Sequence, residues 1–320
     1  MPEPSVCRVK KAACDMLDSP IVENAMTIQQ KSNRRGSGAE SRLNMIPADL
    51  ATPMPLPAYG QPALGVNWTG LRTLYMKEVR RFMKVQLQTV WGPALTTLLF
   101  LAIFSLALGR GDRTELGVPF ADFLAPGLIA MAMIQNAFAN SSFSLLVGKV
   151  QGTIVDYLMP PLSNAELMTA MVGAAVTRAF MVGFALWLAM LLWPGVSVIP
   201  AALPVALLFG LLGSALVGLI GILTSIWAEK FDHAAAVTNF IIAPLALLSG
   251  TFYAVDRLSS TFQAISHANP FFYIISGFRY GFLGRTDSDI VMGAGILFAL
   301  NIAMGILVYQ ILRSGWKLRA

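Results

Sequence analysis

Residues that commonly carry enzymatic chemistry are sparse in this 320-residue sequence, and their spacing does not form a catalytic site. Its Gly-Lys pair, Gly148-Lys149, is followed by Val150 and lacks an upstream glycine at the spacing of a phosphate-binding loop. His233 and His267 fall on opposite sides of the topology derived below, and no carboxylate pair lies within an apolar segment. General acid–base catalysis therefore has no evident site. We predict no catalytic residues and no ATP site in this chain.

Metal and nucleic-acid binding are not indicated either. Cys7 and Cys14 are the two cysteines, and no histidine lies near them, so we predict no metal site and no cofactor. The formal net charge is +6, but the cations lie beside apolar segments. Lipid head groups are the expected counter-charge there, so nucleic acid is not a predicted partner.

Several polar side chains interrupt otherwise apolar segments. Gln135, Asn136 and Asn140 lie near the middle of one segment, with the two asparagines one helical turn apart. They either form interhelical hydrogen bonds or line a substrate path. Arg178 lies well inside the next segment, where a buried cation is costly. It either snorkels or binds backbone carbonyls, or it faces a polar lumen.

A second charged group lies on an amphipathic stretch, residues 71–85. At 100° per residue the cations share one side of a helix and the apolar residues share the other. Glu78 falls on the apolar side, where it pairs with Arg81 at i+3 or meets a basic group of another subunit. Such a helix is typical of a bilayer surface, so we predict an N-terminal amphipathic interfacial helix.

The elements that must position these residues are membrane spans. Hydrophobic residues make up 56% of the sequence and charged residues only 12%, which excludes an ordinary soluble domain. Apolar segments of spanning length predict an all-α polytopic membrane protein with six transmembrane helices. The predicted spans are 90–108, 120–147, 167–193, 201–227, 235–254 and 290–312.

The distribution of Lys and Arg sets the orientation. About twice as many lie near one set of predicted span ends as near the other, so both termini are predicted to be cytoplasmic. The inner group is Arg72, Lys77, Arg80, Arg81, Lys84, Lys149, Lys230, Arg313, Lys317 and Arg319, and the outer group is Arg110, Arg113, Arg257, Arg279 and Arg285.

The segment between the fifth and sixth spans, 255–289, is too apolar for a free loop. It breaks at Asn269-Pro270 into two pieces of helical length, each too short to cross a bilayer. We predict a re-entrant helical hairpin buried against protein, with Arg279 at the level of the outer head groups.

Residues 1–66 are predicted to form a disordered cytoplasmic tail, and 67–320 the transmembrane domain. Charges without period and four closely spaced prolines argue against a folded unit before the first span. The tail is either a dispensable extension, such as an overlong start assignment, or a regulatory element.

Local strings in this chain resemble those of a known family. The strings are KEVRRF at 77–82, FLAPGLI at 123–129, QNAFAN at 135–140 and ANPFFYIISGFRYGFLG at 268–284. Together with the order of elements, they make residues 68–320 resemble a type-2 ABC transporter permease, of the ABC-2 group of bacterial exporters. The last string, with Asn269, Pro270 and Arg279, is the most specific.

The resemblance implies a transmembrane permease subunit in a bacterial inner membrane, working as a homodimer with a separate cytosolic ABC ATPase that binds the ATP. It implies contact with the ATPase through 69–84 and 148–166. From it we expect a coupling helix over 151–158, with Gln151, Asp156 and Tyr157 joining Glu78 and Arg81. Gln135, Asn136, Asn140 and Arg178 are the candidates for the translocation path.

The exported substrate is expected to be a lipid, a glycan or a hydrophobic drug-like molecule. A self-sufficient secondary transporter or channel is the alternative function. That class usually carries intramembrane carboxylates or inverted repeats, and neither is found in the sequence.

Overall fold

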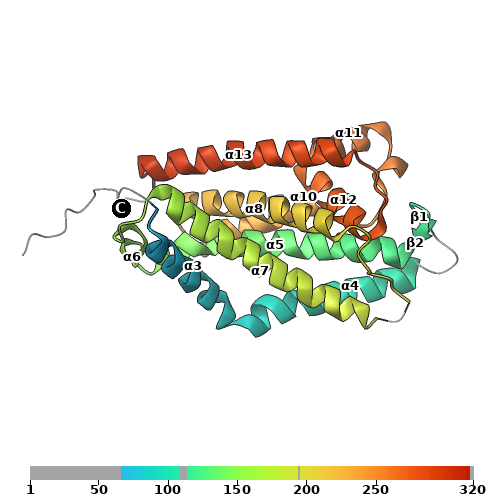
Figure 1. Cartoon of the computed structure of the whole chain (residues 1–320), viewed down its shortest axis with the longest axis horizontal. Helices are drawn as coiled ribbons and strands as arrows, with labels where there is room; N and C mark the ends of the chain where they lie inside the picture. The colour runs from blue at the N-terminus through green and yellow to red at the C-terminus, as the bar shows by residue number, and fades with distance from the viewer. Residues whose placement is uncertain (1–65, 109–113, 194, 318–320) are drawn as a thin grey trace, which may run out of the picture. The chain divides into compact units, whose positions relative to one another are not determined.

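A computed structural model describes residues 66–108, 114–193 and 195–317 (Figure 1). The predicted tail, apart from its last residue, lies outside the described residues. The described part is almost entirely helical, and its one sheet is a short antiparallel pair, β1 (Thr114–Glu115) and β2 (Val118–Pro119).

Five helices are long and apolar enough to cross a membrane. Their bounds agree with five of the six predicted spans to within a few residues. They are the joined helices η1 and α4 (Leu87–Trp91 and Gly92–Leu108), α5 (Phe120–Val150), α7 (Asn164–Leu191), α8 (Leu203–Trp227) and α13 (Ile290–Ser314).

Local sequence explains where several of these helices begin and end. Ser163 and Glu166 form a capping box at the start of α7, each side chain bonding the other's backbone N–H. Asp289 caps α13 by accepting from the N–H groups of two residues in its first turn. Gly315 follows α13 at φ 68°, a left-handed conformation that glycine adopts without strain.

The fifth predicted span, 235–254, differs from the structure. The helix there begins at Phe231 and ends at Leu247, as α9 (Phe231–Val237), η2 (Thr238–Ile242) and α10 (Ala243–Leu247). Its length is about 25 Å, less than the roughly 30 Å of bilayer hydrocarbon. The chain leaves the helix at Leu248 because Gly250 takes φ 73° and its carbonyl binds another part of the fold.

The remaining helices are short. The first is α3 (Trp68–Met83), and α6 (Val155–Leu158) lies between α5 and α7. Three more lie between α10 and α13: η3 (Val255–Arg257), α11 (Ser260–Ala268) and α12 (Pro270–Leu283). The break at Asn269-Pro270 is thus present, but a re-entrant path through a membrane remains a prediction.

Helix α5 lies at the centre of the described bundle and packs against α7 and α8. In its most apolar stretch 78% of residues are buried, against 11% for α13 at the periphery. Helix α8 also contacts α12, where a Cβ on Gly281 would lie 2.5 Å from the backbone nitrogen of Ala206. The two backbones approach this closely because Gly281 has no side chain.

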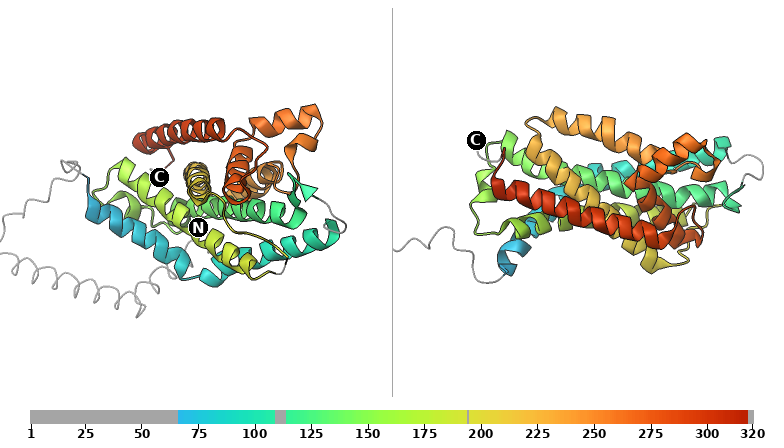
Figure 2. Two further views of the ribbon diagram at one scale, coloured as in Figure 1. Left: turned by 45° about the vertical axis from the view of Figure 1, so that its right-hand side comes forward. Right: turned by 90° about the horizontal axis from the view of Figure 1, so that it is seen from above.

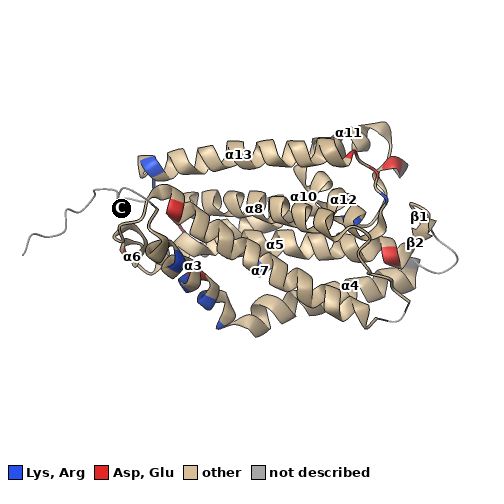
Figure 3. Cartoon of the chain, viewed as in Figure 1, with Lys and Arg blue, Asp and Glu red and all other residues tan. Residues whose placement is uncertain are grey.

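The described bundle has two chemically different ends (Figures 1 and 2). Helices α3 and α6 and the last turn of α13 lie at one end, and α11 and the β1–β2 hairpin lie at the other. Lys and Arg gather on α3 and at the end of α13 (Figure 3). Helices α4 and α8 carry no charged residue.

Candidate functional site

The central group of the candidate site is a carboxylate, Glu78, which is buried where α3, α5 and α6 meet. Glu78 of α3 is 0% exposed, and its Oε2 lies 2.9 Å from Arg81 Nη2. Ser144 Oγ of α5 donates to Glu78 Oε2 at 2.8 Å, and the Tyr157 hydroxyl of α6 donates to Oε1 at 3.1 Å. Of the two pairings left open by the sequence, the structure contains the one with Arg81. We call Glu78, Arg81, Ser144 and Tyr157 the Glu78 junction.

Tyr157 is the member of the junction that belongs to the short helix α6. Its ring packs against Gly148 of α5, where a Cβ would lie 3.3 Å from the ring. Lys77 Nζ lies over the same ring, 3.6 Å from its centroid. Burial, and then the charge of Glu78, raise the pKa of Tyr157 above its usual range, so the hydroxyl stays protonated and donates.

The predicted coupling helix over 151–158 is too long. Only Val155–Leu158 is helical, because α5 ends at Val150 and Gly152 turns the chain at φ 71°. Gln151 and Asp156 are exposed and lie outside the junction. Their predicted role at an ATPase therefore still rests on the family resemblance, and their exposure is compatible with it.

Arg81 links the junction to the predicted translocation residues. Its Nη2 donates to the backbone carbonyl of Asn140 at 2.9 Å, with the Asn140 Oδ1 at 3.4 Å. Two groups that the sequence left separate, the coupling and the path residues, are thus joined directly through α3 and α5.

One turn earlier on α5, Asn136 contacts the interior arginine. Arg178 Nη2 donates to Asn136 Oδ1 at 3.0 Å, and Asn136 Nδ2 donates to the Ala132 carbonyl at 2.9 Å. Asn136 therefore makes the interhelical hydrogen bond that was one of its two predicted roles, and Arg178 binds an amide rather than backbone carbonyls. Gln135 is half-buried on a different side of α5, and no hydrogen bond ties it to this group in the described residues.

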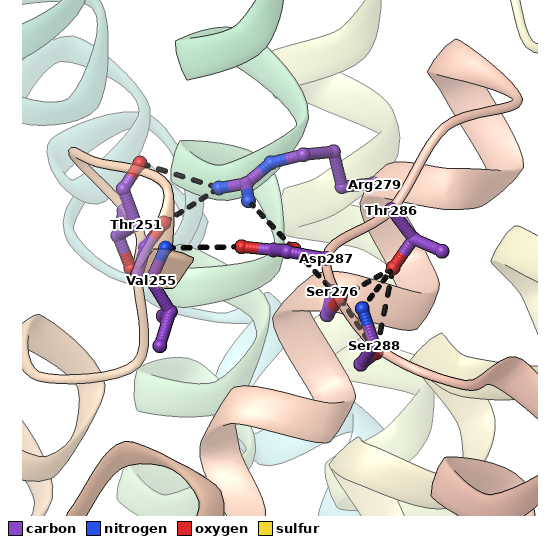
Figure 4. A network of polar contacts seen from close by, with 8 residues as sticks. Thr251, Val255, Ser276, Arg279, Thr286, Asp287 and Ser288 are labelled. Carbon is purple, nitrogen blue, oxygen red and sulfur yellow. Dashed lines mark hydrogen bonds and ion pairs between the residues drawn. The ribbon is translucent and has the colours of Figure 1, made fainter. Parts of the chain in front are cut away.

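Arg279, one of the re-entrant motif residues, belongs to a second polar cluster (Figure 4). Arg279 is 1% exposed, so its side chain is enclosed by protein, and its level relative to the outer head groups stays a prediction. Its Nη2 donates to the Gly250 carbonyl at 2.7 Å, its Nη1 lies 4.0 Å from Asp287 Oδ1, and its guanidinium lies 3.8 Å from the Phe123 ring. These partners compensate a charge that would otherwise stay in water.

Asn269 and Pro270 lie at the start of α12 and fix it to α10. Asn269 Oδ1 accepts from the Phe271 N–H at 3.0 Å, and its Nδ2 donates to the Leu245 carbonyl of α10 at 2.7 Å. Pro270 is the first residue of α12, where a missing N–H costs no hydrogen bond. This motif therefore organises the fold around α10 and α12 and does not reach the Glu78 junction.

Sequence reasoning missed two residues of these clusters, Ser144 and Asp287, and a separate contact made by Lys149. Ser144 lies one turn beyond Asn140 on α5, and that i+4 spacing is a signal that could have found it. Asp287 pairs with Arg279 and also accepts hydrogen bonds from Ser276 Oγ at 3.1 Å and from the Val255 N–H at 3.2 Å. Lys149 Nζ donates to the Ala228 carbonyl at 3.0 Å, at the end of α8, a long-range contact with no local signal.

Comparison with known proteins identifies relatives over the same residues. The family model of the ABC-2 type transporter matches residues 69–283. The chain is 34% identical over 253 residues to the inner membrane transport permease YadH of Escherichia coli strain K12, covering 79% of this chain and 98% of that protein. It is 26% identical over 252 residues to nodulation protein J of Rhizobium leguminosarum bv. viciae, covering 74% and 90%.

These matches confirm the resemblance drawn from the chain's own strings. The family model runs from α3 to α12, and so includes the Glu78 junction and Arg279, and it ends before Asp287. A transport permease is not itself an enzyme. The chain belongs to the ABC-2 type transporter family.

Proposed function

We propose that this chain is the permease subunit of an ABC exporter that uses ATP hydrolysed by a separate ATPase subunit. The observation that carries the proposal is the Glu78 junction, in a member of the ABC-2 type transporter family. It ties α6, on the short connection between two long helices, to α3 and to the interior of α5. A force applied to α6 would reach α5 through buried, charge-assisted contacts.

The surface of α6 is suited to a protein partner. Tyr157 points inward, while Val155, Leu158 and Met159 are 49%, 43% and 55% exposed beside it. Asp156 is exposed among them, and the basic face of α3 is near. An apolar patch rimmed by charges is typical of an interaction site, so we assign the ATPase contact to α6.

We further propose a bacterial inner-membrane location with α3 in the cytoplasmic surface of the bilayer. The relative YadH is named an inner membrane permease, and the cations of α3 and α13 lie at one end of the bundle. In this proposal the helix Phe231–Leu247 is the fifth of six spans, α13 is the sixth, and α11 and α12 form the re-entrant hairpin. Both termini are then cytoplasmic.

The proposed assembly is a homodimer. Phe240 of η2 is 81% exposed, and the adjacent Asn239 is exposed too. Lipid tails offer no hydrogen-bond partner to an amide, so a second copy of the chain is the better cover for this face. The cargo is a lipid, a glycan or a hydrophobic drug-like molecule moved out of the cytoplasm.

Photo-crosslinking tests the ATPase contact. In a variant with Cys7 and Cys14 changed to Ser, single cysteines at Thr153, Val155 or Asp156 would carry a benzophenone maleimide. Irradiation in membranes that also contain the neighbouring ATPase should give an adduct of the summed mass. Ser260→Cys, exposed on α11, is the control that should give none. Adducts at none of the three positions, or equally at Ser260, would contradict the proposed contact.

A further inference from the structure

We infer that Arg178, Arg81, Asn136 and Asn140 form a binding site for an oxyanion group, such as the phosphate or carboxylate head group of an amphiphilic substrate. This inference rests on the proposed transport function, because the bound group would belong to the transported substrate. It adds a substrate class, anionic amphiphiles, which that function leaves open.

Asn136 and Arg178 both lie deep within their helices. Asn136 lies 14 residues before the end of α5 and Arg178 lies 14 residues after the start of α7, and both of those helix ends adjoin α6. Each residue is therefore about 21 Å along its helix from that end, well inside a hydrocarbon layer of about 30 Å. Asn140 is about 15 Å from the same end and holds Arg81, so two guanidinium groups are fixed one turn apart on α5.

The proposed site carries more positive than negative charge. Glu78 already forms an ion pair with Arg81 and accepts hydrogen bonds from Ser144 and Tyr157, so its charge is compensated within the junction. Among the described residues Arg178 has no carboxylate within ion-pair distance; Asn136 is the hydrogen-bond acceptor given for it. The neutral Thr177 hydroxyl beside it bonds to the Tyr75 hydroxyl at 2.7 Å. The group as a whole has an excess positive charge inside the bundle, which favours an anion.

The proposed site contains buried hydrogen-bond donors that have no acceptor. Within the described part of the chain, Arg81 Nη1, Asn140 Nδ2 and Arg178 Nε are buried atoms without a hydrogen-bond partner. Asn140 is 1% exposed, so its amide is aimed into the protein. Three unpaired donors on neighbouring side chains are costly unless an acceptor-rich group binds them, and phosphate and carboxylate oxygens accept several such bonds.

A ligand can approach the proposed site because both of its arginines are partly exposed. The Arg81 side chain is 27% exposed and Arg178 is half-buried, so neither arginine is fully enclosed by the protein. Arg81 lies in the last turn of α3, two residues before the helix ends at Met83. An amphiphile in the cytoplasmic leaflet could place its head group on Arg81 and then on Arg178 without leaving the membrane.

Binding of matched probes to the full-length protein in detergent tests the inference. The probes are farnesyl phosphate, farnesol, which has the same tail without the anion, and inorganic phosphate. Farnesyl phosphate should bind at least about tenfold more tightly than farnesol, as expected for charge-assisted hydrogen bonds. Binding of inorganic phosphate as well would show that a free ion suffices, which supports the same oxyanion chemistry. Equal affinity for farnesyl phosphate and farnesol would overturn the inference.

Variants locate the site. Arg178→Gln should reduce the affinity for farnesyl phosphate about tenfold or more and leave that for farnesol unchanged, whereas Arg80→Gln, an exposed neighbouring cation on α3, should change neither. Removing an interior charge is not expected to unfold the protein, and thermal unfolding checks this. An unchanged affinity in Arg178→Gln, or an equal loss in Arg80→Gln, would overturn the assignment. Because the measurement needs no ATPase, its failure would leave the proposed function standing.

Discussion

At the scale of single residues, the account depends most on Glu78. Glu78→Ala removes the acceptor of Tyr157 and Ser144 and leaves Arg81 unpaired in a partly exposed position. We expect a loss of about 2–3 kcal/mol in unfolding free energy, measured by thermal or denaturant unfolding in detergent.

The matched control is another paired carboxylate. Glu229 accepts from Lys317 Nζ at 2.9 Å, and that hydrogen bond lowers the pKa of Glu229. Because Glu229 is exposed, Glu229→Ala should leave the unfolding temperature nearly unchanged. Equal effects of the two substitutions would mean that Glu78 is not the buried junction described here.

A double-mutant cycle tests the contact between α3 and α6 itself. Tyr157→Phe keeps the ring against Gly148 and removes the hydroxyl that donates to Glu78. Combined with Glu78→Gln, it should show a coupling energy of about 0.5–1.5 kcal/mol in unfolding. The same cycle with Tyr309→Phe, on the exposed side of α13, should be additive. Additivity in both cycles would contradict the contact.

At the scale of elements, the close approach of α12 and α8 is the sharpest feature. A Cβ on Gly281 would meet the Ala206 backbone at 2.5 Å, whereas a Cβ on Gly295 of α13 would meet nothing within 4 Å. Gly281→Ala should therefore cost about 1–3 kcal/mol of stability, and Gly295→Ala should be neutral or slightly stabilising. Thermal unfolding of the two variants separates these expectations. A neutral Gly281→Ala would contradict this packing.

Some elements could be predicted from the sequence because their signals are local. The apolar lengths predict the five long helices, and the helical wheel places Glu78 on the apolar side of α3, where it is buried. The end of the helix at Leu247 could not be predicted, because Ser249, Gly250 and Thr251 carry no charge and apolar residues follow them at 252–254. Its cause is the Gly250 carbonyl binding Arg279, a contact across 29 positions.

The partners of buried charged residues could not be predicted from the sequence. Arg279 carries a charge near a predicted membrane surface, and counting cations places it outside. Its burial depends on Asp287, Phe123 and two carbonyls that only the fold brings together. The junction likewise joins α3 to α6 over 79 positions, and no periodicity shows such a contact.

At the scale of the whole molecule, two polar clusters give the described helices two different ends. The Glu78 junction and the Asn136–Arg178 pair run inward from the basic end, where α6 exposes its apolar side chains. The Arg279 cluster fixes α12 to the chain after α10 at the other end. This division suits a subunit that receives force at one end while the other end keeps its structure.

The measurement that tests this account most directly is copurification of the tagged permease with the products of its neighbouring genes. We expect an ATPase in the eluate whose activity is lost when the lysine of its phosphate-binding loop is changed. Isolated permease with no bound ATPase and no nucleotide-dependent activity would contradict it. The secondary-transporter alternative would then stand, with the family relation one of fold alone.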